Sequence, residues 1–234
     1  HRFLNIAFVA PPSGVVPPTI AGAILSTRRG AWSYTGMVYD PDDQTNDYWV
    51  DGLFTDGVNV SFSPAWNGKV AERATTVGVT AAFSTARGVN LSEILLPPDL
   101  KTGDKRGSYN VALQVSHLLK ASAVQKGRGL GVYAKAATAD GNPNPIRASF
   151  VGGLAGHGMI TRRPWDSFGV GYFYYDLSDA LSDSVAPIAS FGNEQGLELY
   201  YTAAIARWLR LGADMQVVSP ARQNFDPAIV GTLR

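Results

Sequence analysis

The sequence predicts an all-β protein, a transmembrane antiparallel up-and-down β-barrel, and three observations lead to that prediction. Apolar and polar residues alternate along much of the chain, the alternating segments are long, and the breaks between them alternate between short and long. Successive side chains of a β-strand point to opposite faces, so this alternation gives each strand one apolar and one polar face.

The clearest pair of alternating segments lies near the end of the chain, at 194–218. Leu197, Leu199 and Tyr201 alternate with Glu198 and Tyr200, and the pattern resumes after a short break. Each arm runs about 10 residues, close to the roughly 9–11 that a tilted strand needs to cross a membrane, whereas strands of globular proteins usually run about 5–6. Strand length therefore favours a membrane barrel over a soluble sheet.

Eleven segments share this period-two pattern, and none shows a 3.6-residue apolar period over ten residues. They lie at about 19–26, 30–40, 56–64, 72–83, 109–118, 128–138, 147–155, 166–176, 195–205, 208–218 and 227–234. We interpret residues 1–234 as a single barrel domain that is incomplete at its N-terminus.

The breaks between these segments alternate in length. Short breaks fall near 27–29, 65–71, 119–127, 156–165 and 206–207, and longer ones at 40–55, 84–108, 139–146, 177–194 and 219–226. Outer-membrane barrels have short periplasmic turns and longer extracellular loops. The pattern therefore predicts extracellular long loops and a periplasmic C-terminus.

Composition and motifs argue against several other classes of function. The chain has no Cys. Its formal net charge of +1 is far from the strongly basic charge that is typical of nucleic-acid-binding proteins. His1, His117 and His157 show no metal-ligand spacing, and Gly127–Gly131 leads into a strand and not a helix. We predict no enzyme, no cofactor and no metal site.

Several stretches resemble the carbohydrate-selective porins of the OprB family. They are FLNIAF at Phe3–Phe8, GRGLGVYA at Gly127–Ala134, RRPWDSFGVG at Arg162–Gly171, EQGLELYY, RWLRLGADMQVV, and DPAIVGTLR at Asp226–Arg234. The resemblance implies a barrel of about 16 strands, usually a homotrimer, that admits small sugars passively across the bacterial outer membrane. Its other implied partners are outer-membrane lipid and lipopolysaccharide.

The alternation also predicts which side chains line a water-filled channel. A sugar pore needs polar groups that replace part of the hydration shell of a sugar and still release it. Acids and bases both occur among these residues, so we expect modest selectivity between simple anions and cations. Any one of them has the alternative reading of a solvated wall residue or part of a charge ladder between strands. The candidates are Tyr133, Lys135, Arg147, Glu198, Tyr200, Arg210, Asp214 and Gln216.

Residues 1–18 are a candidate for a constriction loop. If the eleven segments are the last eleven strands of such a barrel, 1–18 precede its sixth strand, where general porins fold a loop inward. Arg2 and Asn5 are then candidates to narrow the pore, and the alternative is an ordinary loop or a short strand at 3–9.

Two other functions remain open from the sequence. One is a β-rich surface module that binds glycans through its long loops. The other is a structural barrel that tethers the outer membrane to the cell wall. A barrel fold alone does not imply sugar transport.

Overall fold

The computed structural model describes residues 21–41 and 52–234, and its strands form one antiparallel sheet in which each strand pairs with the next along the chain. The strands are β1 (Gly22–Arg29), β2 (Trp32–Tyr39), β3 (Asn59–Val70), β4 (Arg73–Gly88), β5 (Lys105–Ala121), β6 (Gly129–Ala139), β7 (Ile146–His157), β8 (Ser167–Leu177), β9 (Glu194–Ala204), β10 (Arg210–Ser219) and β11 (Ala228–Leu233). The predicted all-β, up-and-down fold is confirmed, and each predicted segment corresponds to one strand.

Several strands extend further than the alternation predicted. The pairing of β4 with β5 continues past an irregularity between Ser84 and Arg87 to the pair Gly88↔Lys105. Backbone pairing at this end continues through polar residues beyond the last apolar ones. The apolar alternation therefore predicts strands that are too short. The predicted break at 65–71 is also too long, because β3 continues to Val70 and only Ala71 and Glu72 form the turn. Both have positive φ, 49° and 58°, which suits a tight two-residue hairpin.

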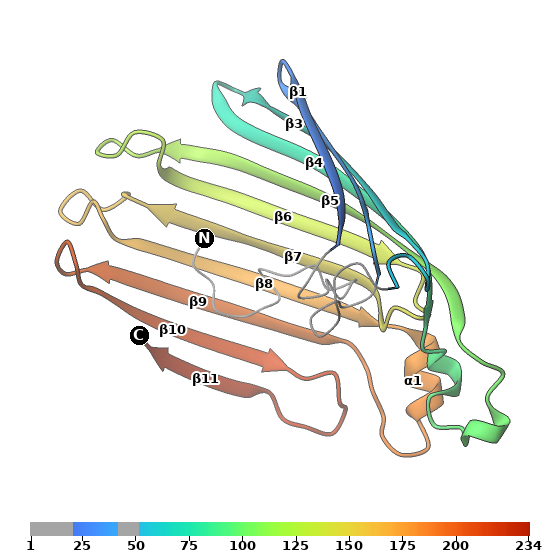
Figure 1. The fold of residues 1–234 in the computed structure, drawn as a ribbon. Coiled ribbons are helices and arrows are strands. Elements are labelled where there is room, and N and C mark those ends of the chain that lie inside the picture. The colour runs from blue at the N-terminus through green and yellow to red at the C-terminus, as the bar shows by residue number, and fades with distance from the viewer. Residues whose placement is uncertain (1–20, 42–51) are drawn as a thin grey trace.

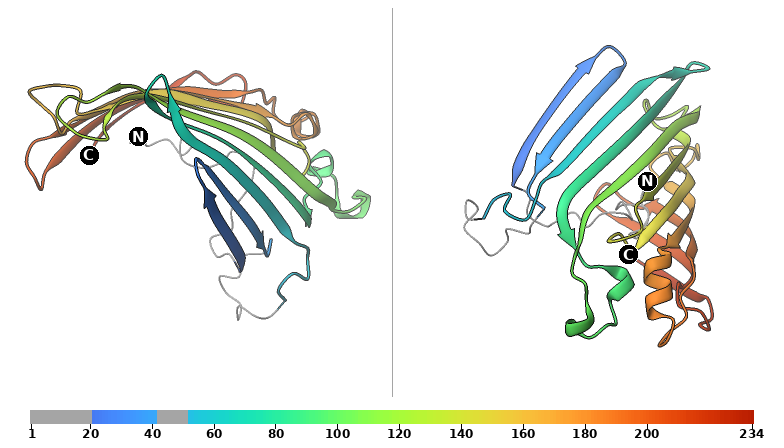
Figure 2. Two further views of the ribbon diagram at one scale, coloured as in Figure 1. Left: turned by 90° about the horizontal axis from the view of Figure 1, so that it is seen from above. Right: turned by 90° about the vertical axis from the view of Figure 1, so that its right-hand side faces the viewer.

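The sheet is strongly curved and open (Figures 1 and 2). Within the described residues β1 pairs only with β2, and β11 only with β10. A bilayer does not tolerate unpaired backbone groups at a sheet edge, because nothing in its core replaces the missing hydrogen bonds. A closed barrel therefore requires strands in addition to these eleven.

The two ends of the sheet differ (Figure 1). At one end, here named the short-turn end, connections are short, as at 30–31, 71–72 and 205–209. At the long-loop end, the loops at 89–104 and 178–193 carry the 3-10 helices η2 (Leu91–Glu93) and η3 (Pro98–Leu100) and the helix α1 (Asp179–Val185). The alternation holds, except that 140–145 is short for the long-loop end and 158–166 is long for the short-turn end.

Three connections at the long-loop end are bound together. The Asn142 side chain accepts a hydrogen bond from the amide of Leu91 (3.1 Å) and donates one to Asn90 Oδ1 (2.8 Å). The amide of Ser178 donates to the carbonyl of Pro145 (2.9 Å), and the Ser178 hydroxyl to that of Gly141. These hydrogen bonds hold the loops at 89–104 and 140–145 and the start of 178–193 against one another.

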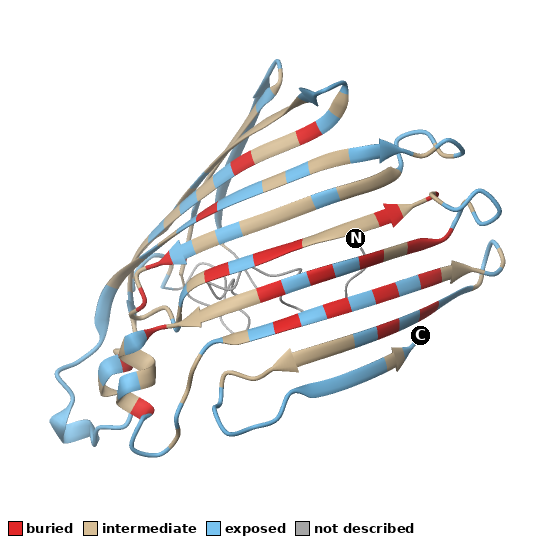
Figure 3. Ribbon diagram, turned by 180° about the vertical axis from the view of Figure 1, so that it is seen from behind, coloured by how far each residue is buried: buried red, intermediate tan, exposed pale blue. Residues whose placement is uncertain are grey.

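Pairing register assigns every strand residue to one of two faces. The outward face carries exposed apolar side chains such as Val111, Leu113 and Leu199, and the inward face carries most of the polar ones. Along β8 to β10, buried and exposed residues alternate as regular stripes (Figure 3). Side chains on the concave face of a curved sheet converge and shield one another, whereas those on the convex face diverge. No helix of the described residues is long and apolar enough to cross a membrane.

Opposite faces of one strand provide a direct test of this assignment. Leu113 and Gln114 are neighbours in the middle of β5, and both are exposed, Leu113 outward and Gln114 inward. We expect Leu113→Arg to lower the free energy of unfolding in a bilayer by about 2–4 kcal/mol, because the arginine charge enters the lipid. Gln114→Arg places the same charge in the channel and should cost little. Equilibrium unfolding of the full-length protein in vesicles measures both, and equal costs would contradict the assignment.

Candidate functional site

Seven of the predicted lining residues share the inward face of the sheet. Tyr133 pairs with Gly153 on β7, and the same row runs through Gly171 to Glu198 and Gln216. The adjacent row, toward the short-turn end, pairs Tyr200 with Asp214. On the same face, Lys135 lies one row from Tyr133 toward the long-loop end, and Arg210 lies two rows from Asp214 toward the short-turn end. The structure therefore brings Tyr133, Glu198, Tyr200, Asp214 and Gln216 into one patch across β6 to β10.

Arg147 lies apart from this patch. The register of β7 against β8 shifts between Ile146 and Ala148, so Arg147 sits at an irregularity at the long-loop end. Its guanidinium pairs with Asp176 (2.8 Å) and Asp179 (2.5 Å). This ion-pair cluster ties β7 to β8 and to the start of α1. Arg2 and Asn5, the predicted constriction residues, lie outside the described part of the chain.

Aromatic rings on the inward face lie against glycines of the neighbouring strand. A Cβ atom added at Gly169 would stand 2.6 Å from the Tyr200 ring, and one at Gly153 would stand 3.1 Å from the Tyr133 ring. Phe173 lies in the same way over Gly196, at 2.4 Å. The absence of a glycine side chain thus lets each ring lie flat on the wall. The sequence shows the glycines and the aromatics, but only the register shows which of them pair.

The inward face is densely packed over β7 to β9. Val151, Phe173 and Tyr200 form a buried cluster, with Tyr133 and Tyr175 packed against it. Glu198 is 1% exposed and Asp214 is 6% exposed. One carboxylate oxygen of Asp214 accepts a hydrogen bond from the Gln216 side chain (3.0 Å). The predicted lining residues thus include buried wall residues, and Arg210 is among the exposed ones.

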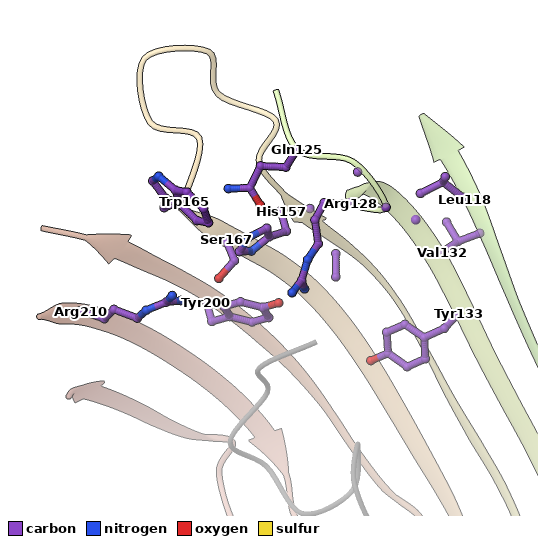
Figure 4. Close-up of a pocket in the computed structure, with 15 residues that line it drawn as sticks. Leu118, Gln125, Arg128, Val132, Tyr133, His157, Trp165, Ser167, Tyr200 and Arg210 are labelled. Carbon is purple, nitrogen blue, oxygen red and sulfur yellow. The ribbon is translucent and has the colours of Figure 1, made fainter. Parts of the chain in front are cut away.

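A cavity of about 460 Å³ opens at the short-turn end beside this patch (Figure 4). The turn at 122–128 contributes Gln125 and Arg128, and β10 contributes Arg210. The floor includes Ser167 and Tyr200. The Gln125 side chain donates to the carbonyl of Pro164 (2.7 Å), and the Ser122 hydroxyl donates to that of Gly158 (2.5 Å). These bonds join the turns at 122–128 and 158–166, so the cavity has a fixed rim. Sequence reasoning identified Arg210 and Tyr200 but not Arg128 or Ser167.

Asp166, within the RRPWDSFGVG stretch, is a buried residue that binds several parts of the chain together. It is 3% exposed, and its carboxylate accepts hydrogen bonds from Arg163, from the Tyr201 hydroxyl and from the amide of Ala204 (2.9 Å). Burial alone raises the pKa of Asp166, but these hydrogen bonds and the charge of Arg163 outweigh it and leave the pKa below its ordinary value. The carboxylate thereby fixes the turn before β8 to the end of β9.

We expect Asp166→Asn to lower the free energy of unfolding at neutral pH by about 1.5–3 kcal/mol, because charge-assisted hydrogen bonds to a buried group are lost. A carboxyl whose folded pKa is lowered stabilises the fold above its unfolded pKa of about 3.9, and this contribution is lost as the pH falls through the folded pKa. The variant should lack this acid-side loss. Unfolding measured against pH tests both points, with exposed Asp226→Asn as the control; equal effects of the two changes would refute this role.

The ring-on-glycine packing makes a second prediction. Gly169→Ala puts a methyl group 2.6 Å from a Tyr200 ring carbon and should cost about 1–3 kcal/mol by overpacking. Gly36→Ala is the matched control, because its Cβ meets no atom closer than 4.0 Å. Chemical unfolding in vesicles compares the two. Equal stability of both variants would show that the ring does not depend on Gly169.

No three His, Cys, Asp or Glu side chains of residues 21–41 and 52–234 are grouped to hold a metal ion.

Comparison with known proteins agrees with this geometry. The sequence profile of the OprB family, described as carbohydrate-selective porin, matches residues 2–234. Among solved structures, the high-pH structure of Pseudomonas putida OprB superposes with a TM-score of 0.75 at 19% sequence identity. The match covers 88% of this chain and 56% of that chain, so the chain spans little more than half of the solved barrel. A comparison with curated proteins finds no match.

Proposed function

This chain belongs to the OprB family of carbohydrate-selective porins, and on that premise we propose that its strands form part of a channel wall through which small sugars diffuse passively. Porins of this family are outer-membrane channels and not enzymes. The finer proposal concerns the solute and the route: uncharged sugars pass along the inward face described above.

The observation that carries the proposal is the separation of the two faces of the sheet. Apolar side chains such as Leu113, Leu199 and Met215 are exposed on the outward face, where lipid accommodates them. Hydroxyl, amide and charged groups gather inward, where they can exchange hydrogen bonds with sugar hydroxyls. Such weak contacts replace hydration without trapping the solute.

The charges of the inward face are mixed in sign. Lys135 and Arg210 share it with Glu198 and Asp214. A channel wall whose charges all have one sign would favour ions of the opposite sign. A wall with charges of both signs discriminates only weakly between small anions and cations. We therefore expect a preference for neutral polar solutes over simple ions of matched size.

We further propose that the long-loop end faces the exterior and the short-turn end faces the periplasm, as the barrel habit indicates. The predicted trimer, the contacts with lipopolysaccharide and the constriction by residues 1–18 stay predictions.

Vesicle swelling with the full-length protein that contains this chain tests the proposal. Neutral monosaccharides and disaccharides should enter faster than ions of matched size, with entry falling steeply as sugar size rises. Vesicles without protein, and vesicles with heat-unfolded protein, are the controls. Absence of swelling with correctly folded protein would refute the pore, and equal entry of sugars and ions would refute the sugar preference.

A further inference from the structure

We propose that the cavity at the short-turn end is a binding subsite for the carboxylate or phosphate group of an anionic monosaccharide. The inference rests on the proposed function, since it gives the same channel a second class of solute at its short-turn mouth.

Two guanidinium groups define the electrostatics of the cavity. Arg128 extends from the turn before β6 and Arg210 from the start of β10, and both point toward the Tyr200 ring (Figure 4). Both arginines are exposed, and neither forms an ion pair with a described carboxylate. Planar guanidinium groups bind carboxylate and phosphate oxygens through paired N–H donors.

Among the described residues, no aspartate or glutamate lines the cavity. Asp166, which precedes Ser167, is engaged by Arg163, Tyr201 and the Ala204 amide. Asp214 and Glu198 lie on the same inward face of the sheet as Arg210, but neither lines the cavity. The cavity therefore keeps a net positive lining beside a wall of mixed charge.

A buried hydroxyl supplies an independent observation. Ser167 lines the cavity and is 4% exposed, and its Oγ atom is buried without a hydrogen-bond partner in the described part of the chain. A buried polar group without a partner is costly, and native structures usually provide one. Rotation about the Cα–Cβ bond of Ser167 would turn this hydroxyl toward the cavity, where an oxygen of a bound anion would accept its proton while the other oxygens meet the guanidinium groups.

The remaining lining fits the body of a sugar. Tyr200 is 2% exposed and closes the floor, whereas Trp165 is 60% exposed at the rim and offers its ring to a solute. Aromatic faces contact the apolar C–H groups of a pyranose ring while its hydroxyls remain available to polar groups. A volume of about 460 Å³ lies within the range of small-molecule sites and accommodates one monosaccharide.

Vesicle swelling with glucose, glucuronate and glucose 6-phosphate tests the subsite in the full-length protein. Glucuronate is a pyranose with a carboxylate and glucose 6-phosphate a pyranose with a phosphate, so the two arms identify the preferred group. We expect Arg128→Gln, Arg210→Gln and Ser167→Ala each to lower the ratio of anion entry to glucose entry severalfold for at least one of the two anions. Arg28→Gln is the matched control, since it removes one inward-facing arginine from β1, far along the sheet.

The outcomes separate this inference from the proposed function. If the wild-type protein admits no glucose, the proposed function fails. If it admits glucose and the three variants change the ratio no more than Arg28→Gln does, the subsite alone is refuted. A loss for glucuronate, for glucose 6-phosphate or for both supports the subsite, and a loss for one of them alone names the preferred oxyanion. Because Ser167→Ala keeps the charge of the wall, a loss in that variant cannot result from a general change of channel potential.

Discussion

The backbone ladder between neighbouring strands is the interaction on which the rest of this structure depends. In a bilayer each strand must pair its N–H and C=O groups with the strands beside it, because lipid offers no replacement. Here every strand pairs with its neighbours in sequence. Once a ladder is formed, its register fixes the face of every side chain, and a slip of one residue would exchange lipid-facing and channel-facing groups.

The irregularities of the ladder respect this constraint. They fall between Ser84 and Arg87, between Leu118 and Lys120, and between Ile146 and Ala148, all toward strand ends. The middle of each strand keeps its period of two, so the outward stripe of apolar side chains stays continuous across the sheet. Extra residues are accommodated toward the strand ends, where a change of face affects few side chains.

The same register explains why sequence predicted the faces better than the contacts. Alternation is a local property, and it grouped Tyr133, Lys135, Glu198 and Tyr200, which the pairing register places on one face of the sheet. It carries no information on which residue of the next strand lies opposite, so the packing of Tyr200 over Gly169 required the structure. Several strands were predicted too short for a related reason. Their backbone ladder continues through residues at which the alternation of apolar and polar side chains has already ended.

Long-range polar contacts set a second limit on prediction. Arg147 fits the inward alternation, yet the irregularity beside it and the carboxylates of Asp176 and Asp179 place it in a cluster at the long-loop end. Asp166 begins the predicted segment 166–176 but lies just before β8, and its three donors come from Arg163, Tyr201 and Ala204. Arg163 is three residues away, but Tyr201 and Ala204 reach Asp166, and Asp176 reaches Arg147, only after the strands have paired.

Both ends of the sheet are held by side chains, and this bears on how the channel mouth works. The Gln125 and Ser122 bonds join the turn that carries Arg128 to the next turn, and Asp166 joins that next turn to β9. Side chains held on a fixed rim bind with a smaller loss of conformational entropy than side chains on a free loop. A wall that stays in place while solute passes requires such anchoring, since the open lumen contributes no packing of its own. The short-turn end thus combines exposed guanidinium groups with a frame that is held by hydrogen bonds between turns and by the buried ring of Tyr200 beneath it.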